Sequence, residues 1–170
     1  LTIAGSDSGG GAGIQADLKA FSSRSVYGAS VITALTAQNT QNVTMVEAVS
    51  SEMIAAQIKA VLDDIDISAI KIGMLGSADV IRLVAHALAH YKGPIILDPV
   101  MVAKSGDRLL ATDAEEALIE FLLPRAWLLT PNLPESACLV KAKQAETIDD
   151  MRQQANALID RGARAVLMKG

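Results

Sequence analysis

A glycine-rich segment near the start of the chain is the first candidate for chemistry. Four of the five residues from Gly9 to Gly13 are glycines, in the sequence SGGGAG between an apolar segment and a helical pattern. Glycines give the backbone freedom and let a ligand approach the main chain, and the N–H groups that begin the next helix attract negative charge. The alternative is a plain tight turn, but four glycines exceed what a turn needs. We therefore expect this loop to contact a ligand.

Two nucleotide-binding patterns can be tested on this loop. Gly11, Gly13 and Ala16 fit the G-x-G-x-x-A pattern of dinucleotide sites. That pattern also needs an acidic residue at the end of the second strand, where this chain has Gln38 and Asn39 instead. A Gly-Lys-Ser/Thr phosphate loop occurs nowhere in the chain. The loop therefore fits neither pattern in full.

The elements that must position such residues follow from the hydrophobic pattern. Short apolar, β-branched segments alternate with segments of helical periodicity, which predicts a mainly parallel α/β sheet with helices on its faces. Ligands bind at the carboxyl ends of the strands of such sheets. Strands are predicted at 1–4, 29–37, 43–49, 69–72, 94–97, 127–130 and 165–168. Helices are predicted from Ile14, from a cap at Ser51, at 77–91, from a cap at Thr112 or Asp113, at 134–141, and from a cap at Thr147 to Gly162.

Six predicted strand ends carry polar or glycine-rich sequence, which is more than loop composition alone supplies. The six segments are 5–13, 38–41, 73–76, 98–107, 130–135, and Lys169 with Gly170. Lys104 and Ser105 fall in the fourth segment, in a loop that could close over a site.

Composition excludes several classes of protein. Of the 170 residues, 51% are hydrophobic and 20% charged, which permits a sizeable core and excludes disorder. Aromatic residues make up only 3% and the net charge is −4, so we expect no nucleic-acid partner. No apolar run is long enough to span a membrane. A single cysteine fits a reducing, cytoplasmic location.

Both ends of the chain resemble cut ends. The chain begins without Met inside an apolar segment, lacks a basic signal-peptide region, and ends at Gly170 directly after AVLMK. We therefore expect the sequence to be part of a longer protein.

Six separated motifs together carry a family resemblance. In order they are AGSDSGGGAGIQADLK, GASVITALTAQNT, KIGMLGS, DPVMVAKSGD, LLTPNLPE and VLMKG. They resemble the hydroxymethylpyrimidine/phosphomethylpyrimidine kinases of thiamine biosynthesis, members of the ribokinase-like superfamily. The resemblance implies a three-layer fold with a central, mostly parallel sheet, usually in a homodimer. It also implies ATP- and Mg²⁺-dependent phosphorylation of 4-amino-5-hydroxymethyl-2-methylpyrimidine and of its monophosphate.

The resemblance implies one partial kinase domain over residues 1–170. The C-terminal part of that domain, with its GTGC segment, is absent from this sequence. The catalytic base, the anion hole and much of the adenine subsite are expected there. The 170 residues alone are therefore expected to be inactive.

The resemblance also assigns two groups of site residues. The aminopyrimidine substrate is expected to contact Gly5, Ala12, Asp17, Gln38, Met74 and Val100. ATP is expected beside Asp98, Asn132, Glu135 and Lys169, with Asp98 and Glu135 at the Mg²⁺ ion and Lys169 on the phosphates.

Each assignment has a structural alternative. The amide of Gln38 can both donate to and accept from a ring, or it can bond the backbone at a strand end. Met74 can pack on a flat ring or fill the core. Asp98 can form a turn before Pro99, and Glu135 can favour the first turn of a helix. Lys169 can be an ordinary strand-edge lysine.

Three further residue types are not expected to act in the site. Cys138 is predicted to pack in the interior, because it lies among apolar residues of a short helix. His86 and His90 are spaced i, i+4 but have no third ligand nearby in sequence. Trp127 begins a strand and is predicted to lie in the core.

Two other functions remain open beside the pyrimidine kinase. One is a pyridoxal kinase, whose substrate is also a flat hydroxymethyl heterocycle. The other is a non-catalytic pyrimidine-binding protein that kept the pocket and lost the chemistry.

Overall fold

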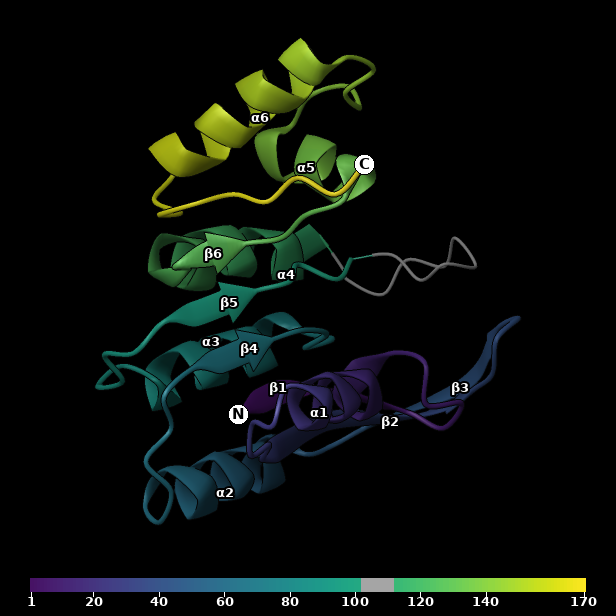
Figure 1. Ribbon diagram of the computed structural model, residues 1–170, viewed down its shortest axis with the longest axis vertical. Coiled ribbons are helices and arrows are strands. Elements are labelled where there is room, and N and C mark those ends of the chain that lie inside the picture. Colours follow the sequence, from purple (N-terminus) through teal and green to yellow (C-terminus); the bar gives the residue numbers. More distant parts are fainter. Residues whose placement is uncertain (102–111) are drawn as a thin grey trace.

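A computed structural model describes residues 1–101 and 112–170 of the chain (Figure 1). Lys104, Ser105 and the other residues of the predicted loop from 102 onward lie outside the described residues, whereas residues 98–101 of that segment are described. No helix in the described ranges is long and apolar enough to cross a membrane.

A six-stranded sheet forms the centre of the molecule, in the order β3-β2-β1-β4-β5-β6. All neighbouring strands are parallel except β2 and β3, which form an antiparallel pair. The predicted mainly parallel sheet is therefore confirmed. The strands are β1 (Thr2–Asp7), β2 (Ser30–Gln38), β3 (Val43–Ala48), β4 (Ile70–Ile72), β5 (Ile95–Leu97) and β6 (Leu128–Leu129).

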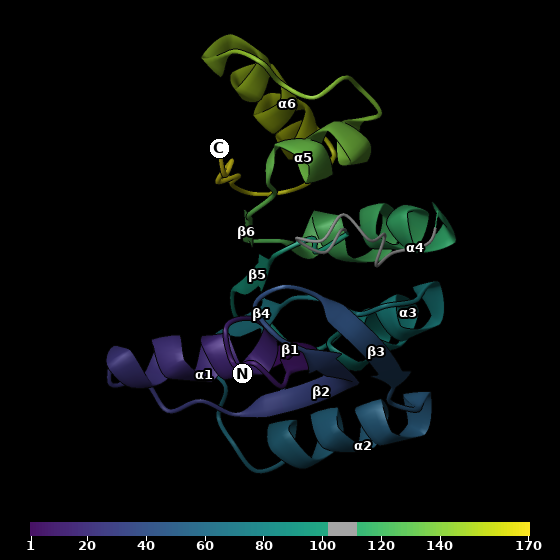
Figure 2. The same ribbon diagram turned by 90° about the vertical axis from the view of Figure 1, so that its right-hand side faces the viewer.

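Helices lie on both faces of this sheet, which gives the predicted three layers. In Figure 2, α1 lies on one face, and α2, α3 and α4 lie together on the other. The helices are α1 (Gly13–Ser23), α2 (Ser51–Leu62), α3 (Ala78–Ala87), α4 (Thr112–Ala117), α5 (Leu133–Val140) and α6 (Ile148–Asp160). A π-helical turn over Leu118–Leu122 and a 3₁₀ turn over Leu123–Arg125 continue α4.

The core lies between the sheet and these helices, and branched aliphatic side chains fill it. Ile3, Ile72 and Leu97 on adjacent strands are fully buried, as are Ile54 on α2 and Ile81 on α3. Short parallel strands that are covered by helices favour such residues. This packing holds the strands whose carboxyl ends carry the polar segments.

Two predicted element boundaries are corrected. Ser50, not Ser51, caps α2, because the Ser50 hydroxyl accepts from the Met53 N–H and its backbone is extended, as a cap requires. Helix α3 ends at Ala87 instead of Tyr91. The Arg125 guanidinium donates to the Ala85 carbonyl, which satisfies part of that helix end.

The last predicted strand is present only in part. Residues 165–168 run parallel to β6, but they form isolated bridges from Val166 to Leu129 and from Lys169 to Asn132. In Figure 1 this segment is the yellow ribbon that crosses in front of α5 and ends at the C-terminus.

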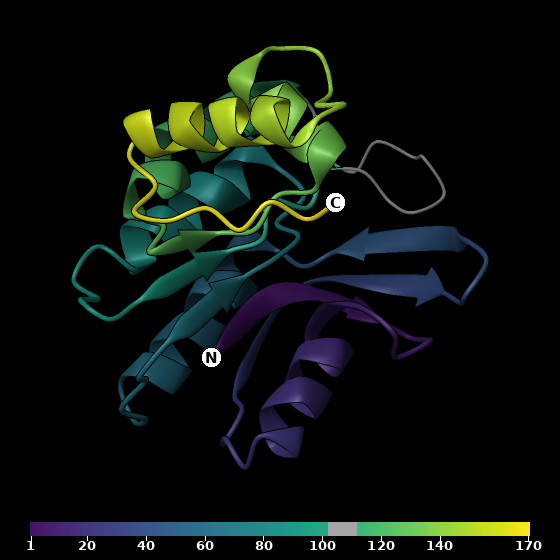
Figure 3. The same cartoon turned by 45° about the horizontal axis from the view of Figure 1, so that its top comes forward.

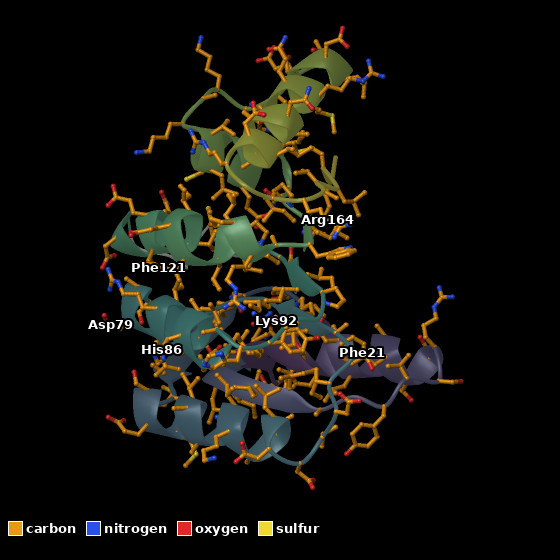
Figure 4. All side chains as sticks on the ribbon, turned by 90° about the vertical axis from the view of Figure 1, so that its left-hand side faces the viewer. Phe21, Asp79, His86, Lys92, Phe121 and Arg164 are labelled. Carbon is orange, nitrogen blue, oxygen red and sulfur yellow. The ribbon has the colours of Figure 1, made fainter. Side chains whose placement is uncertain are left out.

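One prediction about a buried residue is wrong. Trp127 is 48% exposed, with the Arg164 guanidinium 3.5 Å from the centre of its ring (Arg164 is labelled in Figure 4). On α6, Gln154 and Leu158 are buried, whereas Ile148 and Ile159 are exposed. Gln154 can be buried because the Ser136 hydroxyl donates to it and it donates to the Lys143 carbonyl.

The antiparallel edge strand β3 differs from the other strands in its exposure. Met45 is 67% exposed and Val46 is also exposed. Within the described residues, β3 pairs only with β2.

Candidate active site

A cavity of about 500 Å³ opens at the carboxyl ends of β1, β2, β4 and β5. Figure 3 shows the loop after β1 and the β2–β3 turn extending to the same side of the sheet as the C-terminus. All six residues predicted to contact the substrate line this cavity, and Asp98 lines it as well. The six are Gly5, Ala12, Asp17, Gln38, Met74 and Val100.

The glycine-rich loop forms one wall and is folded around a carboxylate. Asp7, the last residue of β1, accepts hydrogen bonds from the N–H groups of Gly9, Gly11 and Ala12 at 2.8–2.9 Å. Burial tends to raise the pKa of Asp7, but the bonds from these N–H groups and from Gly10 outweigh it and hold the pKa below its ordinary value. The loop amides are therefore directed inward, at Asp7.

Gly13 shows why this loop needs glycine where it joins α1. Its φ is +55°, and a Cβ there would lie 2.3 Å from the Gly5 carbonyl oxygen. Gly5 itself lies against Met74, whose terminal methyl carbon would be 2.6 Å from a Cβ added at Gly5. The absence of a side chain at Gly5 thus leaves room for Met74 in the cavity wall, and its absence at Gly13 lets α1 begin against β1.

Gln38 ends β2 and is held to the glycine-rich loop through its backbone. The Ser8 hydroxyl donates to the Gln38 carbonyl at 2.7 Å and accepts from the Gln38 N–H at 2.8 Å. The Thr36 hydroxyl lies 3.3 Å from Oε1 of Gln38. Within residues 1–101 and 112–170, no hydrogen bond holds Nε2 of Gln38. This amide group can therefore donate to a molecule in the cavity.

Asp17 lies in the first turns of α1, where it meets two partners from the sheet. Its Oδ2 accepts from the Thr2 hydroxyl at 2.6 Å and from Lys71 Nζ at 3.0 Å. Thr2 is fully buried, whereas Asp17 and Lys71 both line the cavity. One carboxylate oxygen of Asp17 is thus taken up by the protein itself.

A second group of charges lies at the carboxyl ends of β5 and β6. Asp98 Oδ1 accepts from Lys169 Nζ at 2.7 Å and from the Thr130 hydroxyl at 3.1 Å. Lys169 belongs to the segment beside β6, 71 residues away from Asp98 in sequence. The sheet therefore brings the predicted phosphate lysine and one predicted metal carboxylate into direct contact.

Asn132 and Glu135 form a capping box at the start of α5. The Asn132 side chain accepts from the Glu135 N–H, and the Glu135 carboxylate accepts from the Asn132 N–H, each at 2.8 Å. Burial raises the pKa of Glu135, and the charge of Asp98 raises it further, whereas the Asn132 N–H and Lys169 act in the opposite direction. The isolated bridge between Asn132 and Lys169 places the start of α5 beside the Asp98–Lys169 pair.

The donor set of these residues fits Mg²⁺ as the resemblance implies. Mg²⁺ takes one or two carboxylates and completes its shell with water and phosphate oxygens. Asp98, which is partly buried, and Glu135, which is buried, offer two hard carboxylates, and such a like-charged pair gains from a cation. Within the described residues, no three His, Cys, Asp or Glu side chains lie close enough to hold a metal ion. A cage made of protein ligands alone is therefore not present there.

Cys138, His86 and His90, which were not expected to act in the site, do not line the cavity. Cys138 on α5 is partly buried and packs against the core, as expected. His86 and His90 are exposed on and just after α3, and His86 lies at the surface in Figure 4. They join no metal-ligand group in the described ranges.

Four residues of the cavity region were not singled out from the sequence. They are Thr2, Asp7, Ser8 and Lys71. Asp7 carried a usable signal, because an acidic residue that ends a strand directly before several glycines can accept from the loop amides. The pairing of Lys71 with Asp17 spans 54 residues and left no local signal.

Comparisons with known proteins agree with this geometry. Residues 7–170 match the family model for phosphomethylpyrimidine kinase. The hydroxymethylpyrimidine/phosphomethylpyrimidine kinase of Rhizobium meliloti (strain 1021) is 55% identical over 170 residues, which are 100% of this chain and 64% of that protein.

Solved structures share the fold over the whole chain. The crystal structure of phosphomethylpyrimidine kinase from Clostridium difficile 630 has a TM-score of 0.93 and 47% identity, and covers 100% of this chain and 74% of that one. An ADP complex of Bacillus subtilis pyridoxal kinase has a TM-score of 0.92 and 39% identity, and covers 100% and 65%. The match of the family model to nearly all of the sequence, together with these likenesses, shows that the chain belongs to the phosphomethylpyrimidine kinase family.

Proposed function

We propose that the whole protein transfers a phosphoryl group from ATP to 4-amino-5-hydroxymethyl-2-methylpyrimidine and to its monophosphate, in thiamine biosynthesis. One observation carries the proposal: the six residues assigned to the pyrimidine line a single cavity, which Asp98 of the charged cluster lines as well. A kinase needs this adjacency, because acceptor and phosphates must be held together.

The cavity supports recognition of a flat, neutral aminopyrimidine. Met74 and Val100 supply apolar surface, and Gln38 supplies an amide that can donate to a ring nitrogen and accept from an exocyclic amine. Asp17 offers its remaining oxygen to the polar edge of the substrate. The cavity is large enough for a small ligand of this kind.

The charged cluster supports binding of the ATP phosphates. Lys169 would balance phosphate charge, with Asn132 beside it at the start of α5. Asp98 and Glu135 would hold Mg²⁺, which when bound neutralises charge on the phosphate oxygens. These residues bind and orient the donor, and none of them is assigned as the general base.

We further propose that residues 1–170 belong to one kinase domain and that the general base and the anion hole lie elsewhere in it. The chain spans 64% of the length of the Rhizobium meliloti relative, which supports this division. We also propose a cytoplasmic homodimer, on the family resemblance. Light scattering on the whole protein tests the dimer.

Substitution of Gln38 by Leu tests the pyrimidine assignment. The change keeps the size of the side chain but leaves polar groups of the substrate unpaired, so binding should weaken by about 1–3 kcal/mol. Calorimetry on the full-length protein measures it. Gln153→Leu, on the exposed side of α6, is the matched control and should bind normally. Equal affinities for the two variants would remove Gln38 from the site.

Pyridoxal kinase is the second candidate, because the fold resembles that of the Bacillus subtilis pyridoxal kinase. Rates of phosphoryl transfer to the pyrimidine and to pyridoxal, measured with the full-length protein, distinguish the two. We expect the pyrimidine to be the faster substrate. Tight pyrimidine binding with no transfer to either compound would instead indicate a non-catalytic binding protein.

A further inference from the structure

Asp7 is a buried carboxylate that the proposed reaction does not use. Only 5% of its surface is exposed, at the end of β1 and beneath the glycine-rich loop. Oδ1 accepts from the Gly9 N–H at 2.8 Å, and Oδ2 accepts from the N–H groups of Gly11 and Ala12 at 2.9 and 2.8 Å. Three main-chain donors thus converge on one negative charge.

The backbone of Asp7 is tied to the same loop and to the helix behind it. Its carbonyl accepts from the Gly10 N–H at 3.0 Å. Its N–H donates to Oε1 of Gln15 at 2.8 Å, and the same Gln15 amide donates to the Ser6 hydroxyl. Side chain and main chain of Asp7 therefore act on one loop, whose glycines permit the tight approach.

We propose that Asp7 is a positioning residue for the pyrimidine site. Its carboxylate fills the amide nest of the glycine-rich loop, that is, the N–H groups of Gly9, Gly11 and Ala12. It thereby fixes the loop as a wall of the cavity for a neutral ring. This inference rests on the proposed function, because it assigns the loop to the pyrimidine. Asp7 acts through Gly9, Gly11 and Ala12, whose N–H groups donate to its carboxylate and which line the cavity together with Asp7.

The same geometry excludes this loop as the phosphate cradle. Loop amides bind phosphate only when their N–H groups are directed at it. Here three of those groups already donate to Asp7. The low pKa of Asp7 keeps it charged at neutral pH, so a phosphate would also meet a negative charge. The ATP phosphates must therefore bind elsewhere. Lys169, at the carboxyl ends of β5 and β6, is the candidate to bind them.

Amide exchange and titration of the unaltered full-length protein give the first test. We expect slow hydrogen exchange at Gly9, Gly11 and Ala12 without any ligand. In NMR spectra, the pyrimidine should shift these amide signals, whereas ADP and inorganic phosphate should leave them unchanged. Fast exchange at these amides, or shifts caused by ADP or phosphate, would overturn the proposal. Neither of these two results depends on the pyrimidine being the substrate.

Asp7→Asn gives the second test, with Asp79→Asn as the matched control. Asn presents N–H hydrogens to loop amides that need an acceptor, so exchange at Gly9, Gly11 and Ala12 should become at least tenfold faster. KM for the pyrimidine should rise at least tenfold, and KM for ATP should change less than twofold. Asp79 is exposed at the start of α3, paired with Arg82, and its variant should behave as the unaltered protein does.

The readouts separate a positioning role from general damage. A merely destabilised protein would lose active molecules, which lowers kcat and leaves both KM values unchanged; that result would contradict the proposal. If the unaltered protein does not phosphorylate the pyrimidine, the proposed function fails, while the exchange data still report on the Asp7 nest. If Asp7→Asn does not fold, the exchange and titration data on the unaltered protein decide.

Discussion

Lys71 Nζ lies 3.0 Å from Oδ2 of Asp17 and so joins β4, in the middle of the sheet, to helix α1. Both side chains are mostly buried, with 21% and 16% of their surfaces exposed. Thr2 donates to the same carboxylate oxygen, from the strand next to that of Lys71. This ion pair between distant parts of the sequence therefore helps to hold α1 against the sheet, together with the bonds from Thr2 to Asp17 and between Gln15 and β1.

A double-mutant cycle on Asp17→Asn and Lys71→Met should show a coupling free energy of about 1–3 kcal/mol, because partly buried charges interact strongly and removal of one leaves the other unpaired. Urea unfolding of the full-length protein measures it. The exposed Asp79–Arg82 pair on α3 is the control and should couple by less than about 0.5 kcal/mol. Equal couplings in the two pairs would contradict a role for burial.

Glu135→Gln should raise the Mg²⁺ concentration needed for turnover by roughly 10–100-fold, as loss of a carboxylate that holds the ion through water does. Pyrimidine affinity should stay nearly unchanged. The melting temperature should hold or rise, because Gln can complete the capping box without a buried charge. Glu52→Gln, in the exposed first turn of α2, is the control. Lost pyrimidine binding with unchanged Mg²⁺ dependence would show that the two subsites are wrongly divided.

Gly13→Ala should destabilise the protein by at least about 1–3 kcal/mol, because a Cβ there meets the Gly5 carbonyl and the backbone is left-handed. Gly11→Ala is the matched control in the same loop: its Cβ would lie 3.9 Å from the Asp7 carboxylate, an ordinary contact. Thermal unfolding compares the two variants. Similar melting temperatures for both would show that the loop has another conformation in solution.

Acid should selectively weaken the loop that Asp7 holds. The pKa of Asp7 is lowered in the folded protein, so the folded state binds fewer protons than the unfolded state in this range. Its contribution is present above the unfolded pKa of about 4 and is lost as the pH falls through the folded pKa. The difference in unfolding free energy between the unaltered protein and Asp7→Asn should therefore shrink between about pH 5 and pH 2. A constant difference over that range would show that Asp7 is not charged in the fold.

Much of the architecture could be predicted because local patterns determine it. The alternation of apolar segments with helical periods predicted the parallel sheet, the predicted cap at Thr147 is the cap of α6, and the helix start predicted at 77 lies within one residue of the start of α3. Local sequence patterns did not predict helix ends and buried polar residues that depend on contacts with residues distant in sequence. Arg125 donates to a carbonyl near the end of α3, which is shorter than predicted, and Ser136 and the Lys143 carbonyl allow the polar Gln154 to be buried on α6.

The candidate site was predicted to a similar extent. All six residues that the motifs assigned to the pyrimidine line one cavity, since strand ends of one parallel sheet must meet at one edge. Their contact with the pyrimidine stays a prediction. Sequence alone did not show which atoms pair. The bonds from Ser8 to Gln38 and from Lys71 to Asp17 arise only when β1, β2, β4 and α1 are assembled.

The exposed edge strand β3 has a practical consequence for handling the protein. Its outer edge offers unpaired main-chain groups in the described structure, and Met45 and Val46 add apolar surface beside them. Such an edge is a template for strand addition by another copy of the chain. Glu47 is the strand's only charged residue. In concentrated samples, aggregation is therefore expected to begin at this strand, and Glu47 is the residue that opposes it.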